Sequence, residues 1–216
     1  MTMGVAVSGV KAATADLNTT AHNIANVGTT GFKNSRAEFS DMVAGKNGIG
    51  AQTAAVNQLF QQGGVNSTGN DGSSGQLDLA IIGNGFFTVK DSNGTPFYTR
   101  AGSFHMDATS RKIVNNLGQS LQSAAGADIT VPADPVAITG FDSMTGKINF
   151  SDGTSAQVGL VNFPNTQGLK AVGDTNWIAT TASGAATAIA APGTGTLGSV
   201  KGGALEASNV DLTDQL

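Results

Sequence analysis

Few side chains in this sequence could carry out chemistry, and their spacing matches no catalytic pattern. The two histidines, His22 and His105, lie far apart in the chain. There is no cysteine, which excludes disulfides, thiolate metal sites and a cysteine nucleophile. The sequence also lacks the Gly-x-Ser-x-Gly, His-Glu-x-x-His, Walker and EF-hand patterns. A lone histidine is more often a surface or structural residue than a ligand, so we nominate neither for catalysis.

The acidic residues and one glycine-rich turn have simpler structural explanations. Several aspartates stand in or beside expected turns, where their side chains bond the local backbone. They are Asp78, Asp91, Asp107, Asp142 and Asp152. The run Gly83-Asn-Gly-Phe-Phe-Thr lacks the third glycine of a dinucleotide fingerprint and opens no helix, so it predicts a tight strand connection. We therefore predict no enzymatic activity, no cofactor and no metal site.

The strongest pattern is an apolar stripe near the N-terminus. Its residues recur at alternating intervals of four and three, like the a and d positions of a coiled coil. They are Met3, Val7, Val10, Thr14, Leu17, Ala21 and Ile24. The stripe predicts a helix over residues 3–26 that is roughly 36 Å long. It ends where Asn26 and Gly28 permit a left-handed C-terminal turn.

A narrow stripe on a long helix needs a partner helix, so we interpret these seven residues as an assembly seam. The alternative is an ordinary amphipathic helix that packs against its own domain.

Composition narrows the class of protein further. The chain has 216 residues, of which 12% are charged, about half the usual share. The net charge is −4 and no basic patch rich in aromatic residues occurs, so we expect no nucleic-acid partner. No run of 18 apolar residues exists, so we expect no membrane span. The first residues have no basic region followed by an apolar one, unlike a secretory signal peptide.

The middle of the chain consists of short apolar segments separated by turn signals. Asn93-Gly94 predicts a hairpin between residues 86–90 and 96–100. Phe86 and Phe87 must face opposite sides of their strand, and Trp177 is expected in the core. The predicted fold class is mainly β with a long N-terminal α-helix. It combines a β-sandwich or barrel-like domain with a terminal helical (coiled-coil) segment.

Several motifs resemble those of one protein family. The N-terminal signature consists of Asn23, Ile24, Ala25 and Asn26, then Gly31, Phe32 and Lys33. This signature resembles that of bacterial flagellar rod and hook proteins, the axial subunits of the flagellum. Further stretches that resemble the family are residues 77–89, 98–104, 162–169 and 203–212. Together the motifs extend over nearly the whole chain.

The resemblance implies a structural subunit of the flagellar hook that assembles into a helical tube around an export channel and contributes to motility. The implied partners are further copies of the chain, other axial proteins of the rod, the hook–filament junction and the hook cap, and the type III export apparatus. The implied location is the hook or basal body of the flagellum, outside the cell, or in the periplasm for a rod protein.

The resemblance also divides the chain into four segments. They are residues 1–44, an N-terminal axial helix with its connecting segment; 45–76, an extended linker region; 77–202, a β-rich domain; and 203–216, the start of a truncated C-terminal helical segment. Because the family's C-terminal helix would begin where the sequence ends, the seam has no partner helix here. We therefore expect residues 1–26 to be largely disordered in the isolated chain.

Two alternatives stay open at this point. Only about 40 residues separate Leu121 from Asn162, too few for the additional outer domain typical of hook subunits. A basal-body rod subunit is therefore the first alternative. An extracellular β-sandwich adhesin or binding module is the second, although such a module has no need for a seam on a terminal helix.

Overall fold

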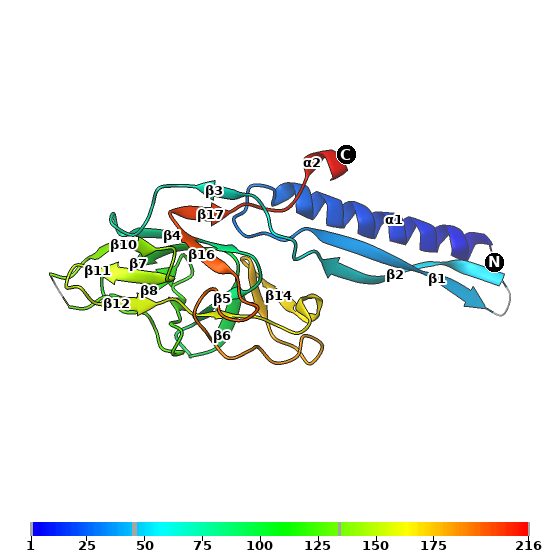
Figure 1. Cartoon of the computed structure of the whole chain (residues 1–216). Coiled ribbons are helices and arrows are strands. Elements are labelled where there is room, and N and C mark those ends of the chain that lie inside the picture. The colour runs from blue at the N-terminus through cyan, green and yellow to red at the C-terminus, as the bar shows by residue number, and fades with distance from the viewer. Residues whose placement is uncertain (1, 45–46, 134, 216) are drawn as a thin grey trace.

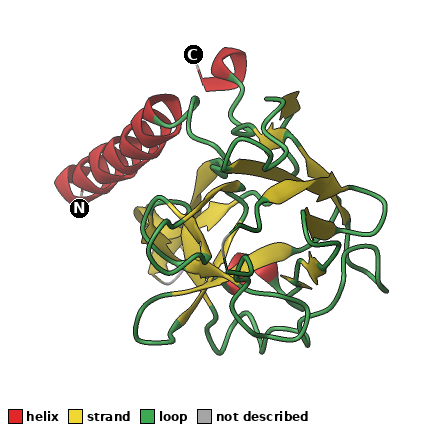
Figure 2. Cartoon of the chain, turned by 90° about the vertical axis from the view of Figure 1, so that its left-hand side faces the viewer, coloured by secondary structure: helices red, strands yellow, loops and turns green. Residues whose placement is uncertain are grey.

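The computed structural model describes residues 2–44, 47–133 and 135–215. The chain forms an elongated arm attached to a β-rich body (Figure 1). The arm, residues 2–58 without 45 and 46, contains three elements. They are α1 (Thr2–Ala25), β1 (Ser35–Ala44) and β2 (Asn47–Gln58). Viewed from the end of the body, after a turn of 90°, α1 lies to one side of the body (Figure 2).

Helix α1 matches the predicted helix to within one residue at each end. The side chains that it turns toward the β1–β2 ribbon are short, so the helix and the ribbon approach closely. They are Ser8, Ala12, Ala15, Thr19 and Asn23, all at least partly buried. Gly50 lies so close to α1 that a Cβ atom there would come within 2.1 Å of Ser8 Oγ. The same hydroxyl accepts a hydrogen bond from the Ala51 backbone N–H at 3.3 Å.

The ribbon corrects two expectations from the sequence. Residues 45–76, predicted as an extended linker, contain the whole of β2, and β3 (Val65–Ser67) as well. Strands β1 and β2 pair antiparallel from Ser35↔Gln58 to Ala44↔Asn47, with two irregularities in the register. Residues 1–26 were expected to be largely disordered, but the described part forms α1, because the ribbon covers one of its faces. The domain boundaries themselves stay a prediction.

The body is built on a ten-stranded sheet. The first and last strands of the predicted β domain, residues 77–202, both belong to this sheet. Its order is β14-β15-β6-β5-β9-β8-β7-β4-β16, and β13 pairs with β5 beside this path. The strands are β4 (Gln76–Ile82), β5 (Phe86–Lys90), β6 (Pro96–Thr99), β7 (Ser103–Met106), β8 (Ile113–Asn115), β9 (Ser120–Leu121), β13 (Leu160–Val161), β14 (Lys170–Gly173), β15 (Asn176–Ile178) and β16 (Ser199–Gly202).

Smaller elements complete the body. A three-stranded sheet has the order β10-β11-β12, and a two-stranded one pairs β17 with β3. The remaining elements are β10 (Ile138–Asp142), β11 (Lys147–Phe150), β12 (Ser155–Gln157), the 3-10 helix η1 (Thr166–Gly168), β17 (Ala204–Glu206) and α2 (Leu212–Gln215). The pairing of β17 with β3 brings residues 204–206 beside residues 65–67, which follow the arm in sequence.

Two apolar clusters form the core on the two faces of strand β5. Phe87 packs into the larger cluster with residues such as Leu79 and Phe104. Phe86 packs on the other side with Tyr98 and Trp177. The predicted opposition of the two phenylalanines, the Asn93-Gly94 hairpin between β5 and β6, and the burial of Trp177 are all confirmed.

The fold class predicted from the sequence, mainly β with one long N-terminal helix, is confirmed. No helix among the described residues combines the length and the hydropathy needed to cross a membrane.

The tight contact at Gly102 gives a test of the packing in the body. A Cβ atom at Gly102 would lie 1.6 Å from the Leu79 carbonyl oxygen, whereas one at Gly64 meets no atom within 4 Å. We expect Gly102→Ala to lower the free energy of unfolding by about 1–3 kcal/mol or more through overpacking. Gly64→Ala should be neutral or stabilising by about 0.4–1 kcal/mol, because it restricts the unfolded chain. Urea unfolding of both variants measures this, and equal effects would contradict the packing described.

Candidate assembly interface

The seven predicted seam residues all lie on the exposed side of α1. Leu17 is 69% exposed and Met3 is 81% exposed. No described part of the chain covers the stripe, while the opposite side of the helix faces the ribbon. The structure thus leaves the stripe exposed, and its use as an assembly seam stays a prediction.

Exposed apolar side chains are concentrated on the arm. Of the 14 large hydrophobic residues exposed among the described residues, nine belong to the arm, which is about a quarter of the chain. These nine are Met3, Val5, Val7, Val10, Leu17, Ile24, Val27, Phe39 and Val56. Such a concentration of exposed apolar side chains is typical of an interaction site.

The first half of the family motif joins α1 to the ribbon. The Asn23 side chain is buried and pairs with the Ser35 backbone like a neighbouring strand. Its Nδ2 donates to Ser35 O at 2.8 Å, and its Oδ1 accepts from Ser35 N at 2.9 Å. Asn26 closes the helix end, where its Nδ2 donates to His22 O at 2.9 Å. Ile24 and Ala25 are exposed instead, so they face away from this junction.

The second half of the motif fits the chain against the body. Gly31 has a φ of 70°, and a Cβ atom there would lie 2.6 Å from the Ala101 backbone nitrogen. Only glycine combines this left-handed conformation with so close an approach. Phe32 is buried, and its ring centroid lies 5.4 Å from that of His22. His22 therefore has a packing role at the junction.

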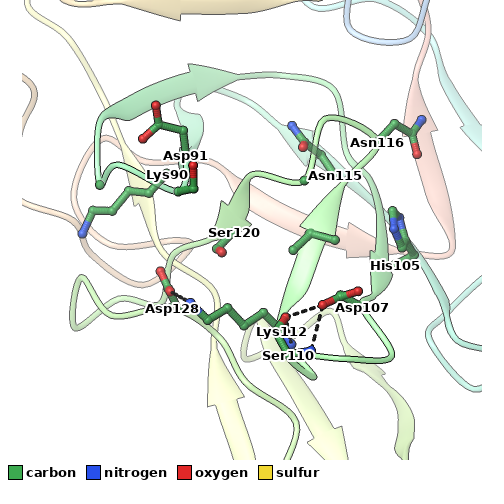
Figure 3. A pocket seen from close by; sticks show the side chains of 14 residues that line it. Lys90, Asp91, His105, Asp107, Ser110, Lys112, Asn115, Asn116, Ser120 and Asp128 are labelled. Carbon is green, nitrogen blue, oxygen red and sulfur yellow. Dashed lines mark hydrogen bonds and ion pairs between the residues drawn. The ribbon is translucent and has the colours of Figure 1, made fainter.

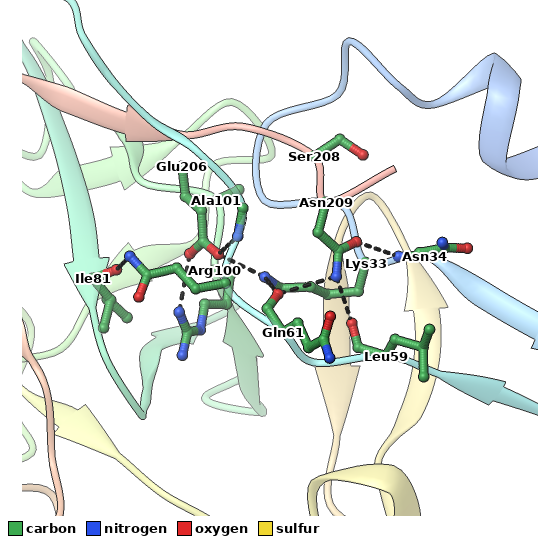
Figure 4. A network of polar contacts seen from close by, with 12 residues as sticks. Lys33, Asn34, Leu59, Gln61, Ile81, Arg100, Ala101, Glu206, Ser208 and Asn209 are labelled. Carbon is green, nitrogen blue, oxygen red and sulfur yellow. Dashed lines mark hydrogen bonds and ion pairs between the residues drawn. The ribbon is translucent and has the colours of Figure 1, made fainter. Parts of the chain in front are cut away.

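Lys33 ends the motif in a buried ion-pair network (Figure 4). Its Nζ lies 2.6 Å from Glu206 Oε1 and donates to Gln61 O at 2.8 Å. The other carboxylate oxygen of Glu206 lies 3.0 Å from Arg100 Nη1. The side chains of Lys33 and Glu206 are fully buried. Burial lowers the pKa of Lys33, and the nearby Glu206 carboxylate opposes that shift.

Glu206 and Arg100 were not singled out from the sequence, although both stand inside stretches that resemble the family. Arg100 also donates to Gly83 O at 2.6 Å and lies over the Phe86 ring, 5.6 Å from its centroid. Glu206 further accepts from the Gly63 backbone N–H at 3.0 Å. A buried Lys33 needs an anion nearby, and this need could have pointed to Glu206. The sequence, however, does not reveal that Lys33 is buried.

A polar hollow of about 690 Å³ lies on the body (Figure 3). His105 and Asp107 line it, together with Lys112 and Asp128. Asp107 accepts hydrogen bonds from Ser110, and Lys112 Nζ lies 2.6 Å from Asp128 Oδ2. The hydrogen bonds from Ser110 lower the pKa of Asp107. The described residues contain no group of three or more His, Cys, Asp or Glu side chains able to hold a metal ion.

Comparison with known proteins agrees with this geometry. Residues 80–150 match the family "Flagellar hook protein FlgE/F/G D1 domain", and residues 3–33 match "Flagella basal body rod protein". The chain is 37% identical to the flagellar basal-body rod protein FlgG of Bacillus subtilis, with 97% of this chain and 84% of that protein aligned. It is 34% identical to FlgG of Agrobacterium fabrum, with 99% of this chain and 87% of that protein aligned.

The flagellar hook protein FlgE of Salmonella typhimurium is 42% identical over 144 residues, which cover 64% of this chain and 34% of that protein. The chain belongs to the flagellar rod and hook axial protein family. It is a structural subunit of the bacterial flagellum and not an enzyme, and the adhesin alternative is set aside. Members of this family are axial proteins of the flagellum. The exposed stripe and the family motif therefore belong to a subunit of an axial polymer.

The stripe gives a direct test of association. Because Leu17 is exposed, Leu17→Asp should change the free energy of unfolding by less than about 1 kcal/mol. In an assembly the same aspartate would be buried without a partner, so polymer formation should be lost. Leu117→Asp is the matched control, because Leu117 is a 50% exposed leucine on the body. Sedimentation and electron microscopy compare the variants; polymers of Leu17→Asp like those of the parent would rule out the seam.

Proposed function

We propose that this axial protein is a subunit of the flagellar basal-body rod. The observation that carries the proposal is the extent of the alignments. Rod proteins align over 97–99% of this chain and 84–87% of their own length. The hook protein aligns over 34% of its length. This chain therefore has the proportions of the rod relatives.

The architecture of the body supports the same proposal. Between β9 and β13, where the resemblance places an additional outer domain in typical hook proteins, the described chain forms only the small β10-β11-β12 sheet and its loops. That segment packs against the main core through Ile138, Ile148 and Phe150. It is part of the body and not a separate outer domain.

The subunit would act through repeated contacts between copies. A stripe that binds a different surface on the next copy makes a heterologous contact, which generates an open helical polymer when the rotation does not close. On this proposal the arm's apolar side chains are buried between neighbouring subunits. The partners would be further copies, adjoining axial proteins and the type III export apparatus, and the location would be the periplasm.

A hook subunit is the second candidate. The specific observation in its favour is the higher identity to the hook protein, 42% against 34–37% for the two rod proteins. The two candidates use the same arm and differ in where along the flagellum the polymer stands.

Deletion of the gene from the source bacterium separates the candidates. A rod subunit lies beneath the hook, so we expect electron microscopy of purified basal bodies to show incomplete rods and no hooks. Complete rods that lack hooks would contradict the rod assignment and favour the hook. Normal flagella would contradict both. Restoring the gene for the full chain should restore the rods, which controls for effects on neighbouring genes.

A further inference from the structure

The arm meets the body at a narrow junction made of two chain connections, residues 26–34 and 59–64. Phe60 packs its ring 5.6 Å from Phe86 and 5.5 Å from Trp177, measured between centroids. Gln62 adds polar contacts to the body, where its Nε2 donates to Ile81 O and its Oε1 accepts from Gly83 N.

The C-terminal segment, residues 203–215, binds both connections at once. The Glu206 carbonyl accepts from Gly31 N at 2.8 Å, and its carboxylate binds Lys33. Asn209 accepts from Asn34 N at 2.7 Å and donates to Leu59 O at 2.7 Å.

Two further hydrogen bonds extend this attachment. Ala207 N donates to Gly64 O at 2.7 Å, and Asn23 Nδ2 donates to Gln215 Oε1 at 3.1 Å. The last described residues thus hold the arm at its base.

This attachment depends on the negative charge of the Glu206 carboxylate. The network contains two cations, Lys33 and Arg100, and one anion, Glu206, all with buried side chains. Arg100 itself lowers the pKa of Lys33, because the two positive charges repel. Without the Glu206 carboxylate, two cations would be buried without a counter-ion, which proteins avoid by opening the structure.

We propose that strand β17, through Glu206, locks the arm onto the body. The arm then keeps one fixed position only while β17 is bound at the junction. All residues of the larger core cluster lie between Leu77 and Val200, outside the arm and β17, so the body can remain folded while the arm is released. The lock makes presentation of the N-terminal stripe depend on a residue 173 positions away from Lys33. It does not depend on whether the subunit belongs to the rod or the hook.

Hydrogen exchange of the full chain, read by mass spectrometry, tests the lock. Glu206→Gln should speed amide exchange in β1, β2 and α1 by at least about tenfold, since local opening is then favoured. Exchange in β4, β5 and β7 should stay within about twofold of the parent. Asp128→Asn is the matched control, because it makes the same acid-to-amide change in the half-exposed pair with Lys112.

Each outcome decides the proposal. Unchanged exchange in the arm of Glu206→Gln would overturn it, and so would an equal rise in the arm and the body. An arm response of the same size in Asp128→Asn would overturn it as well. If Glu206→Gln does not fold, Glu206→Asp replaces it in the test. Aspartate keeps the negative charge, but its side chain is one methylene shorter, so the carboxylate lies farther from Lys33 and Arg100. We expect Glu206→Asp to speed amide exchange less than Glu206→Gln does, and again only in the arm.

Discussion

One buried carboxylate, that of Glu206, joins the N-terminal motif, the body and the C-terminal strand β17. It binds Lys33 at the end of the N-terminal motif and Arg100 in the body, both within 3.0 Å. Burying three charges costs solvation that their attraction only partly returns, so the network is a weak source of net stability. On our proposal its effect is specificity, because an arrangement of the arm that separates Lys33 from Glu206 leaves a buried charge without its partner.

The remaining features follow from this fixed junction. The arm keeps one face of α1 against the ribbon through small side chains, and the other face carries the exposed apolar stripe. A stripe on a freely moving helix would bind in many orientations, whereas a stripe on a braced arm presents one geometry to each neighbour. A subunit of a flagellar axial polymer needs that uniform geometry, since small angular errors accumulate along an open helical assembly.

Local patterns predicted the parts of the fold that depend on local physics. The heptad spacing predicted α1, Asn93-Gly94 predicted the β5–β6 hairpin, and strand alternation separated Phe86 from Phe87. The β1–β2 ribbon was missed because β2 is rich in Gly, Ala and Gln and has no clear apolar alternation. The β3–β17 pairing and the Lys33–Glu206 contact were missed because long-range partners leave no local signal.

A double-mutant cycle on Lys33 and Glu206 tests the central claim most directly. Hydrogen exchange in α1, β1 and β2 would give the free energy of arm opening for the parent, Lys33→Met, Glu206→Gln and the double variant. Glu206→Gln should lower the free energy of arm opening by about 3–5 kcal/mol, because two buried cations lose their counter-ion. Lys33→Met should cost less, because Glu206 keeps Arg100 as its partner. The double variant should lose less than the sum by about 1–3 kcal/mol, the range for groups in one network. Additivity within about 0.5 kcal/mol would contradict the account.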